Sequence, residues 1–258
     1  MKWPKESKLN GLIVVLLALT LWETISRFEL ANPLFFPPMT RIFNAFFALV
    51  LSGEIPHQIL LSLKRASAGY LLAALVSIPL GIAMGFFDWL HRMLEVIIET
   101  ARPIPPPVIV PVAILFFGIG DEMKVFVIFF SCAWPILLNT FDGVRNIDRV
   151  LLHTARTFGL SRAQAITKVI LPAASPQIMT GLRISLPITL ILVVISEMVG
   201  STDGIGYFIL DAQRRFKVAQ MYAGMLSLAL LGYLLNQLFF LFYDLFLGWH
   251  RGLTRKER

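Results

Sequence analysis

Six long apolar runs dominate this chain and leave it no water-soluble fold. A helix needs about 20 apolar residues to cross the hydrocarbon core of a bilayer. The runs cover residues 9–26, 66–87, 93–118, 125–141, 182–200 and 218–243. The chain is 57% hydrophobic and only 15% charged, whereas a soluble domain carries about 25% charged residues. The sequence therefore predicts an all-α, polytopic membrane bundle of about six transmembrane helices, with residues 1–258 forming a single membrane domain.

The distribution of basic residues predicts how the bundle is oriented. An even number of spans places both termini on one side, and cytoplasmic segments are enriched in Lys and Arg. Placing the termini in the cytoplasm puts most of the Lys and Arg residues inside, with Arg65 and Lys124 among the minority outside. This enrichment explains the net charge of +7, and nucleic-acid binding is disfavoured.

Several motifs of enzyme chemistry are missing from the sequence. A P-loop needs Gly-x-x-x-x-Gly-Lys-Ser/Thr, and the chain contains no Gly-Lys dipeptide. Its one cysteine, Cys132, lies in an apolar run, where a small buried side chain is the favoured interpretation. The four histidines lack the spacing of metal ligands. We therefore expect a transport protein rather than an enzyme, with no metal or cofactor in this chain.

A polar, basic stretch from His153 to Arg183 lies between two apolar runs. It predicts two short helices, 151–157 and 162–170, with Gly159 between them in left-handed or tightly packed backbone. Ser161 is placed to cap the second helix. Leu171-Pro172 is expected to end it, because proline disfavours helical backbone in the residue before it. The result is a rigid helical elbow, although linkers of this size are common and geometry alone assigns it no role.

The spacing within this elbow resembles the cytoplasmic loop by which permease subunits of bacterial ABC importers bind their ATPase. That loop consists of Glu-Ala-Ala, three residues, Gly, nine residues, Ile, one residue and Leu-Pro. The residues in register are Ala155, Gly159, Leu171 and Pro172, while His153, Thr154 and Val169 stand where Glu, Ala and Ile are usual. The stretch from Pro176 to Arg183 is similar to the family's continuation into its fifth span.

The resemblance implies a type I importer permease whose coupling loop covers residues 143–181. The residues that it assigns to ATPase coupling are His153, Ala155, Phe158, Gly159, Leu160 and Arg162, with Pro172 and Gly181 joining the elbow to the membrane.

Prolines interrupt the third apolar run. The segment from Arg102 to Pro107, followed by Pro111, is not expected to form regular helix, because each proline removes a backbone donor and clashes with the preceding turn. Irregular backbone at membrane depth is tolerated in a packed kink or along a water-filled path, and both alternatives stay open. The segments E-T-A-R-P-I-P-P, F-F-G-I-G-D-E and P-I-L-L-N-T also resemble the nitrate, sulfonate and taurine branch of these permeases.

Charged residues within the spans are costly in lipid and are expected to face the bundle. They are Glu95, Glu99, Arg102 and Glu197. Arg102 is spaced to pair with Glu99 or Glu95 on a helix, either as a static pair or to position an anion. The residues assigned to the translocation pathway are Arg102, Pro105, Pro106, Glu197 and Met198.

Three further features concern packing. Gly81 and Gly85 form a Gly-x-x-x-Gly pattern, which lets helices approach closely either within the bundle or at a subunit interface. Thr40 is placed to cap an amphipathic helix over 42–50 that lies on the membrane or packs on the bundle. The glycines of residues 200–207 suit a re-entrant turn, which the resemblance implies is a periplasmic gate.

The resemblance also implies the partners of the chain. They are a second permease subunit, expected to be identical, two ATPase subunits that hold ATP and Mg²⁺, and a periplasmic or lipid-anchored binding protein. The assembly would lie in the bacterial inner membrane and carry a small anion such as sulfonate, taurine or nitrate. An uncharged heterocycle such as a thiamine precursor or riboflavin is the alternative within the family. An ATP-independent carrier or channel is the alternative from another class, ahead of a membrane-embedded enzyme.

Overall fold

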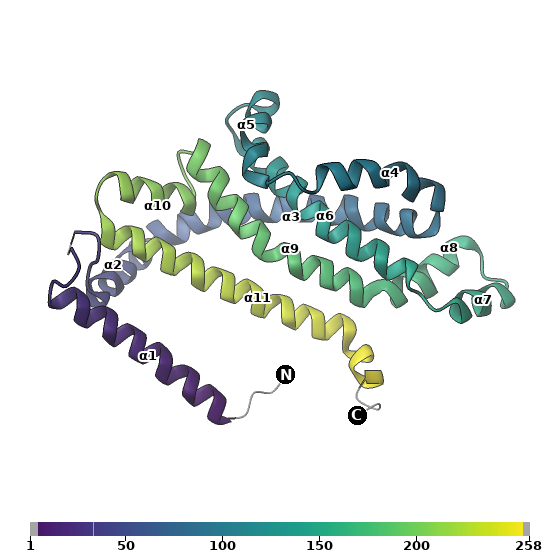
Figure 1. Cartoon of the computed structure of the whole chain (residues 1–258), viewed down its shortest axis with the longest axis horizontal. Helices are drawn as coiled ribbons and strands as arrows, with labels where there is room; N and C mark the ends of the chain where they lie inside the picture. The colour runs from purple at the N-terminus through teal and green to yellow at the C-terminus, as the bar shows by residue number, and fades with distance from the viewer. Residues whose placement is uncertain (1–4, 33, 255–258) are drawn as a thin grey trace. The chain divides into compact units, whose positions relative to one another are not determined.

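The chain is helical, as the apolar runs predict. The computed structural model describes residues 5–32 and 34–254, and no strand occurs within them. Two compact units contain the helices shown in Figure 1: unit 1 comprises residues 1–61 and 203–230, and unit 2 comprises residues 62–202 and 231–258. Two helices, α3 (Glu54–Phe86) and α11 (Val218–Thr254), run from one unit into the other. The single membrane domain stays a prediction.

Unit 2 is built on α6 (Asp121–Arg145), which packs most extensively against α9 (Leu171–Gly200) and also against α5 (Pro106–Phe117). The buried core between these helices and α3 is almost entirely aliphatic, with residues such as Val110, Val127, Ile128 and Val193 each at most 1% exposed. Cys132 is a small buried side chain within this core. The apolar interior of unit 2 therefore lies along α6.

The small residues of α3 allow it to approach α6 closely. A Cβ atom added to Gly81 would lie 2.8 Å from the backbone oxygen of Leu137, and one added to Gly85 would lie 2.6 Å from Val144 Cβ. Gly69 is equally close to Ile128. Of the two interpretations left open by the Gly-x-x-x-Gly pattern, the structure therefore supports close packing within the chain.

Four helical segments are long and apolar enough to cross a membrane: 54–86, 121–145, 163–200 and 218–245. A fifth span results if the bent pair α4 (Asp88–Ala101) and α5 counts as one. The first predicted span falls in α1 (Lys5–Arg27), and the structure does not describe all of the side chains of this helix. The first of the six predicted spans therefore stays a prediction, and the other five predicted segments coincide with these helices.

The predicted break in the third span is present, and α4 and α5 meet at an angle of 101°. Its extent is shorter than expected, because Pro106 and Pro107 form the first turn of α5 and Pro111 lies inside it. A proline in the first helical turn removes a donor that would have no intrahelical partner. The prediction that Pro106, Pro107 and Pro111 are excluded from regular helix was therefore wrong.

Unit 1 contains α1, α2 (Met39–Leu51) and α10 (Ile205–Arg214). The indole of Trp22 stacks on Phe36 at 3.9 Å between ring centroids and meets the edge of Tyr222. Thr40 does not cap α2, contrary to the prediction: the helix begins one residue earlier, and Thr40 donates its Oγ1 hydrogen to Glu23. Gly204 precedes α10 with φ +98° and donates its N–H to Gln58 Oε1 at 2.6 Å.

Candidate functional site

The elbow predicted from the sequence is present in unit 2. It consists of α7 (Arg149–Thr157), the short α8 (Arg162–Ala165) and η1, a π-helical turn over Ile166–Ile170 (Figure 1). The N–H of Val150 donates to the Asp148 side chain and so caps α7. At the start of α8, the N–H of Gln164 donates to Ser161 Oγ and the N–H of Ser161 donates to Gln164 Oε1. This reciprocal pair is a capping box and confirms the predicted cap.

Gly159 has the left-handed backbone that the sequence predicts, with φ +67°. The N–H of Leu160 donates to the Ala155 carbonyl and the N–H of Gly159 donates to the Arg156 carbonyl. These two hydrogen bonds form a Schellman motif, which satisfies the last carbonyls of α7. The turn between the two helices is therefore fixed by its own backbone.

Pro172 does not end the second helix of the elbow, which is a correction to the sequence prediction. Residues 163–200 form one continuous helical segment that passes through Leu171 and Pro172 into α9. The N–H of Leu171 donates to the Ile166 carbonyl, five residues back, which defines the π-helical turn. This wider turn accommodates the proline ring, which clashes with the carbonyl four residues earlier in a regular helix. The elbow is consequently a direct extension of α9.

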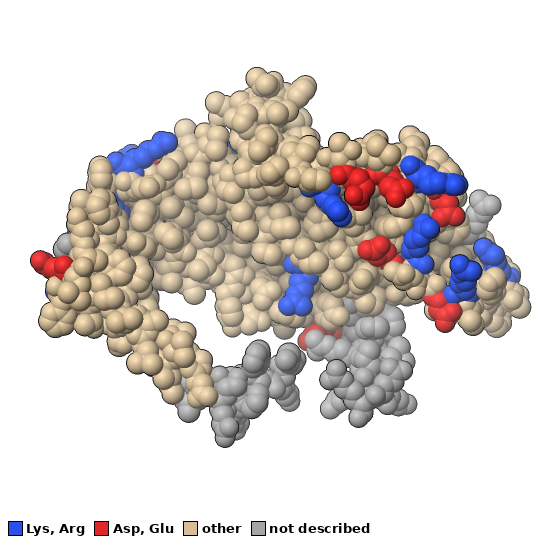
Figure 2. Space-filling model, viewed as in Figure 1, with Lys and Arg blue, Asp and Glu red and all other residues tan. Residues whose placement is uncertain are grey.

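The residues assigned to ATPase coupling lie in different environments. Phe158 is 79% exposed at the turn, beside Gly159, and His153 is also exposed. Ala155 is only 5% exposed and, with half-buried Leu160, lines a hollow of about 350 Å³ beneath the turn. Charged side chains gather around α4 and this end of unit 2 in Figure 2.

The remaining coupling residues lie along the extension. Arg162 begins α8, and its side chain is outside the described part. Pro172 is exposed in the first turn of α9, and Gly181 packs against α6, where an added Cβ would lie 2.9 Å from the Pro135 carbonyl oxygen.

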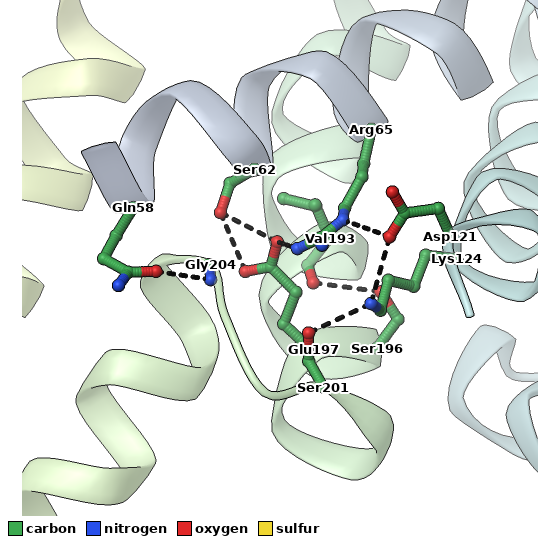
Figure 3. Close-up of polar contacts among 10 residues, drawn as sticks. All are labelled: Gln58, Ser62, Arg65, Asp121, Lys124, Val193, Ser196, Glu197, Ser201 and Gly204. Atoms are coloured by element: carbon green, nitrogen blue, oxygen red, sulfur yellow. Dashed lines mark hydrogen bonds and ion pairs between the residues drawn. The ribbon is translucent and has the colours of Figure 1, made fainter. Parts of the chain in front are cut away.

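A second site lies at the opposite end of α9, where the buried charges of Arg65, Lys124 and Glu197 meet the exposed carboxylate of Asp121. Glu197 is fully buried and accepts hydrogen bonds from Ser62 Oγ, at 2.8 Å from each carboxylate oxygen, and from Arg65 Nη1 at 2.9 Å (Figure 3). Arg65 is itself 5% exposed. Burying a carboxylate is costly unless an opposite charge and hydrogen bonds compensate it, and Arg65 and Ser62 supply both here. Glu197 thus ties α9 to α3.

The same cluster extends to the start of α6. Arg65 Nε donates to Asp121 Oδ1 at 2.7 Å, and Lys124 Nζ lies 3.3 Å from the same oxygen. Lys124 Nζ also donates to Ser201 Oγ at 3.0 Å (Figure 3). Two cations and two anions therefore balance across α3, α6 and α9. We call this group the ion cluster; it consists of Ser62, Arg65, Asp121, Lys124, Glu197 and Ser201. It joins the three helices roughly 40 Å from the elbow, at ~1.5 Å of helix rise per residue along α9.

The other residues assigned to the pathway lie at or near helix ends. Arg102 is exposed at the bend between α4 and α5, and its Nη2 is 3.9 Å from Glu99 Oε1, which is also exposed. The prediction that these two charges face the bundle is wrong for the chain as described. Pro105 is exposed in the same bend, Pro106 begins α5, and Met198 is half-buried next to Glu197.

The sequence singles out Glu197 as a charge within a span, but not the residues that bind it. Counting basic residues places Arg65 and Lys124 among the outer loops, yet both are buried in the ion cluster. The one available signal is that Arg65 directly precedes a long uncharged run, at a depth where an unpaired charge is costly. Nothing in the local pattern connects it to a carboxylate 132 positions away along the chain.

The fold is that of a helical membrane transport protein with a helical elbow extending from one span. A family model described as "binding-protein-dependent transport system inner membrane component" matches residues 77–249. The chain belongs to this family, and it is a type I ABC importer permease, a multi-pass protein of the inner membrane.

Individual relatives agree with this assignment. The chain is 31% identical to the taurine transport system permease protein TauC of Escherichia coli over 243 residues, which cover 91% of this chain and 88% of TauC. It is 37% identical to the nitrate import permease protein NrtB of Leptolyngbya laminosa over 181 residues, covering 70% of this chain and 65% of NrtB. A structure titled as inward-facing conformations of the MetNI methionine ABC transporter has a similar fold, with a TM-score of 0.61 at 20% identity, covering 72% of this chain and 92% of that one.

Proposed function

We propose that this chain is the membrane-spanning subunit of an ATP-driven importer that carries a small anion, such as a sulfonate, taurine or nitrate, into the cytoplasm. Two copies of the chain surround one pathway, and a periplasmic or lipid-anchored binding protein delivers the solute. Two ATPase subunits, which hold ATP and Mg²⁺, bind the elbows on the cytoplasmic side, where both termini also lie. The named substrates of TauC and NrtB support an anion as the solute.

The observation that carries the proposal is the construction of the elbow. Its turn presents an exposed Phe158 next to Gly159, while its second helix continues without interruption into α9. A displacement of the turn is therefore transmitted along a single helix toward the ion cluster at the far end of α9. ATP binding shifts the bundle between inward and outward states only by favouring one of them, and this rigid connection supplies a physical link.

Purification from the native membrane in mild detergent tests the proposal. We expect a P-loop ATPase to copurify in stoichiometric amount, and the complex in proteoliposomes to take up taurine or nitrate only with ATP inside and the binding protein outside. Uptake by the chain alone in ATP-free vesicles would instead identify a carrier or channel. ATP-dependent uptake of a thiamine precursor or riboflavin, with no uptake of anions, would contradict the proposed solute.

Gly159→Asp is expected to weaken ATPase binding by at least about tenfold, equivalent to about 1.4 kcal/mol. No heavy atom lies within 4 Å of an added Cβ at Gly159, and aspartate tolerates left-handed backbone better than most residues, so the fold should persist. The new charge instead lies at the docking face. Copurified ATPase per permease measures the effect.

Two matched variants separate charge from backbone. Gly159→Asn has nearly the same shape without the charge and should retain most of the binding. Gly53→Asp places the same side chain on another open glycine of positive φ, +81°, outside the elbow, and should bind like the wild type. Normal uptake and ATPase binding by Gly159→Asp at normal expression would remove the elbow from the coupling site.

A further inference from the structure

A hollow of about 470 Å³ lies between α9 and α11 in unit 2, separate from the elbow and the ion cluster. It is lined by Met179, Thr180, Arg183 and Ile184 of α9 and by Phe240 and Tyr243 of α11. Arg183 is the sole cation among these lining residues, and its side chain is exposed on the surface of the chain. The hollow therefore combines apolar walls with one positive charge.

The guanidinium of Arg183 is held by an aromatic ring. Its central carbon lies 4.4 Å from the centroid of the Phe240 ring, within the range of a cation–π contact. Stacking in this way supports the guanidinium plane and leaves the N–H groups at its edge to bind a ligand. Among the described residues, no salt bridge joins Arg183 to a carboxylate, in contrast to buried Arg65.

The position of Arg183 along α9 makes an external anion the natural partner for this charge. Arg183 lies roughly 20 Å before Glu197 at ~1.5 Å of rise per residue, in the first turn of the predicted span 182–200. A basic side chain between helices at the edge of a membrane span lies where the anionic groups of lipids or of solutes reach it. The side chain of a helical residue leans toward the helix N-terminus, which here directs Arg183 toward the elbow end of α9.

We propose that this hollow binds an oxyanion group of the phosphate or sulfonate type, held by the N–H groups of Arg183. The planar guanidinium donates paired hydrogen bonds to such groups, and Phe240 orients it. Thr180 Oγ1 donates to the Pro176 carbonyl at 2.9 Å, so Arg183 supplies the donors and Thr180 contributes to the wall. Two sources have this chemistry, the phosphate of a membrane phospholipid and a small anion in transit. The second source rests on the proposed function, and the first does not.

Binding to the purified complex, stripped of lipid in detergent, tests the assignment in two arms. Native mass spectrometry follows adducts of dioctanoyl phosphatidylglycerol, and calorimetry follows methanesulfonate. Arg183→Gln should lower the affinity for at least one probe by about tenfold or more, because a hydrogen bond to a charged group is lost. Arg183→Lys keeps the charge without the planar guanidinium, so its affinity for the probe should lie between those of the wild type and Arg183→Gln. Arg92→Gln, an exposed arginine on α4, serves as the matched control and should bind as the wild type does.

Phe240→Leu provides a second, milder variant that keeps the charge. Loss of the ring should reduce the affinity of the same probe by about two- to fivefold. Loss of the lipid adduct alone in Arg183→Gln assigns the hollow to a phospholipid, and loss of methanesulfonate binding alone assigns it to a small anion. If Arg183→Gln binds both probes like the wild type, the proposal is wrong. Copurification of the ATPase is measured in the same samples, so failure of the proposed function is recognised separately.

Discussion

Glu197→Ala is expected to lower the free energy of unfolding by about 3–5 kcal/mol, the usual cost of removing one partner from a buried ion pair. The change removes the carboxylate that lies 2.9 Å from Arg65 Nη1 and 2.8 Å from Ser62 Oγ, while the Arg65 charge stays buried. The contact that ties α9 to α3 at this end of unit 2 is lost. Thermal unfolding of the purified protein in dodecyl maltoside, followed by tryptophan fluorescence, measures the loss.

Two comparisons make this prediction specific to burial. Glu99→Ala removes the carboxylate of an exposed pair, in which Arg102 Nη2 is 3.9 Å away, and should change stability by less than about 1 kcal/mol. The double variant Arg65→Met/Glu197→Leu removes both charges of this pair and should recover much of the stability lost by Glu197→Ala, because the remaining Lys124 and Asp121 still balance one another. Equal melting temperatures for Glu197→Ala and Glu99→Ala would show that the ion cluster does not stabilise unit 2.

Gly81→Ala is expected to destabilise the protein by about 1–3 kcal/mol, the cost of overpacking a close contact. The added methyl would lie 2.8 Å from the Leu137 backbone oxygen and from Thr140 Cβ, so α3 and α6 must move apart. Rotation of a side chain does not relieve contact with a backbone atom. The same unfolding measurement in detergent checks the change.

Gly11→Ala is the matched control for this substitution. Gly11 also lies inside a helix, α1, but no heavy atom lies within 4 Å of an added Cβ. Alanine is better than glycine inside a helix by roughly 0.5–1 kcal/mol, so this variant should be neutral or slightly more stable. A Gly81→Ala protein as stable as Gly11→Ala would contradict close packing of α3 on α6.

Local patterns predicted several features correctly, because each of these features depends on interactions among residues that are close together in the sequence. The thickness of the bilayer sets the length of an apolar span, so five predicted spans coincide with apolar helices or the bent pair. The requirement for left-handed backbone identified Gly159, and capping chemistry identified Ser161. Consecutive prolines predicted the bend between α4 and α5.

The same local patterns failed at Pro172, Pro111 and Thr40. Pro172 was predicted to end a helix, but a π-helical turn before it keeps the helix continuous. Pro111 lies inside α5, and Thr40 lies one residue beyond the start of α2 and contacts Glu23 instead. A helix tolerates a proline when the preceding turn widens, and sequence spacing does not reveal that adjustment.

What the sequence determined by itself is the membrane class, most of the helical segments and the outline of the elbow, since each follows from apolar length, composition or residues close together in the chain. What only the tertiary structure decided is the ion cluster and the hollow at Arg183. Arg65 and Glu197 meet although 132 positions separate them, and Arg183 meets Phe240 on another helix. The packing of α3 and α11 beside α9 brings these side chains together, and the low dielectric of the interior makes the pairing of their charges matter.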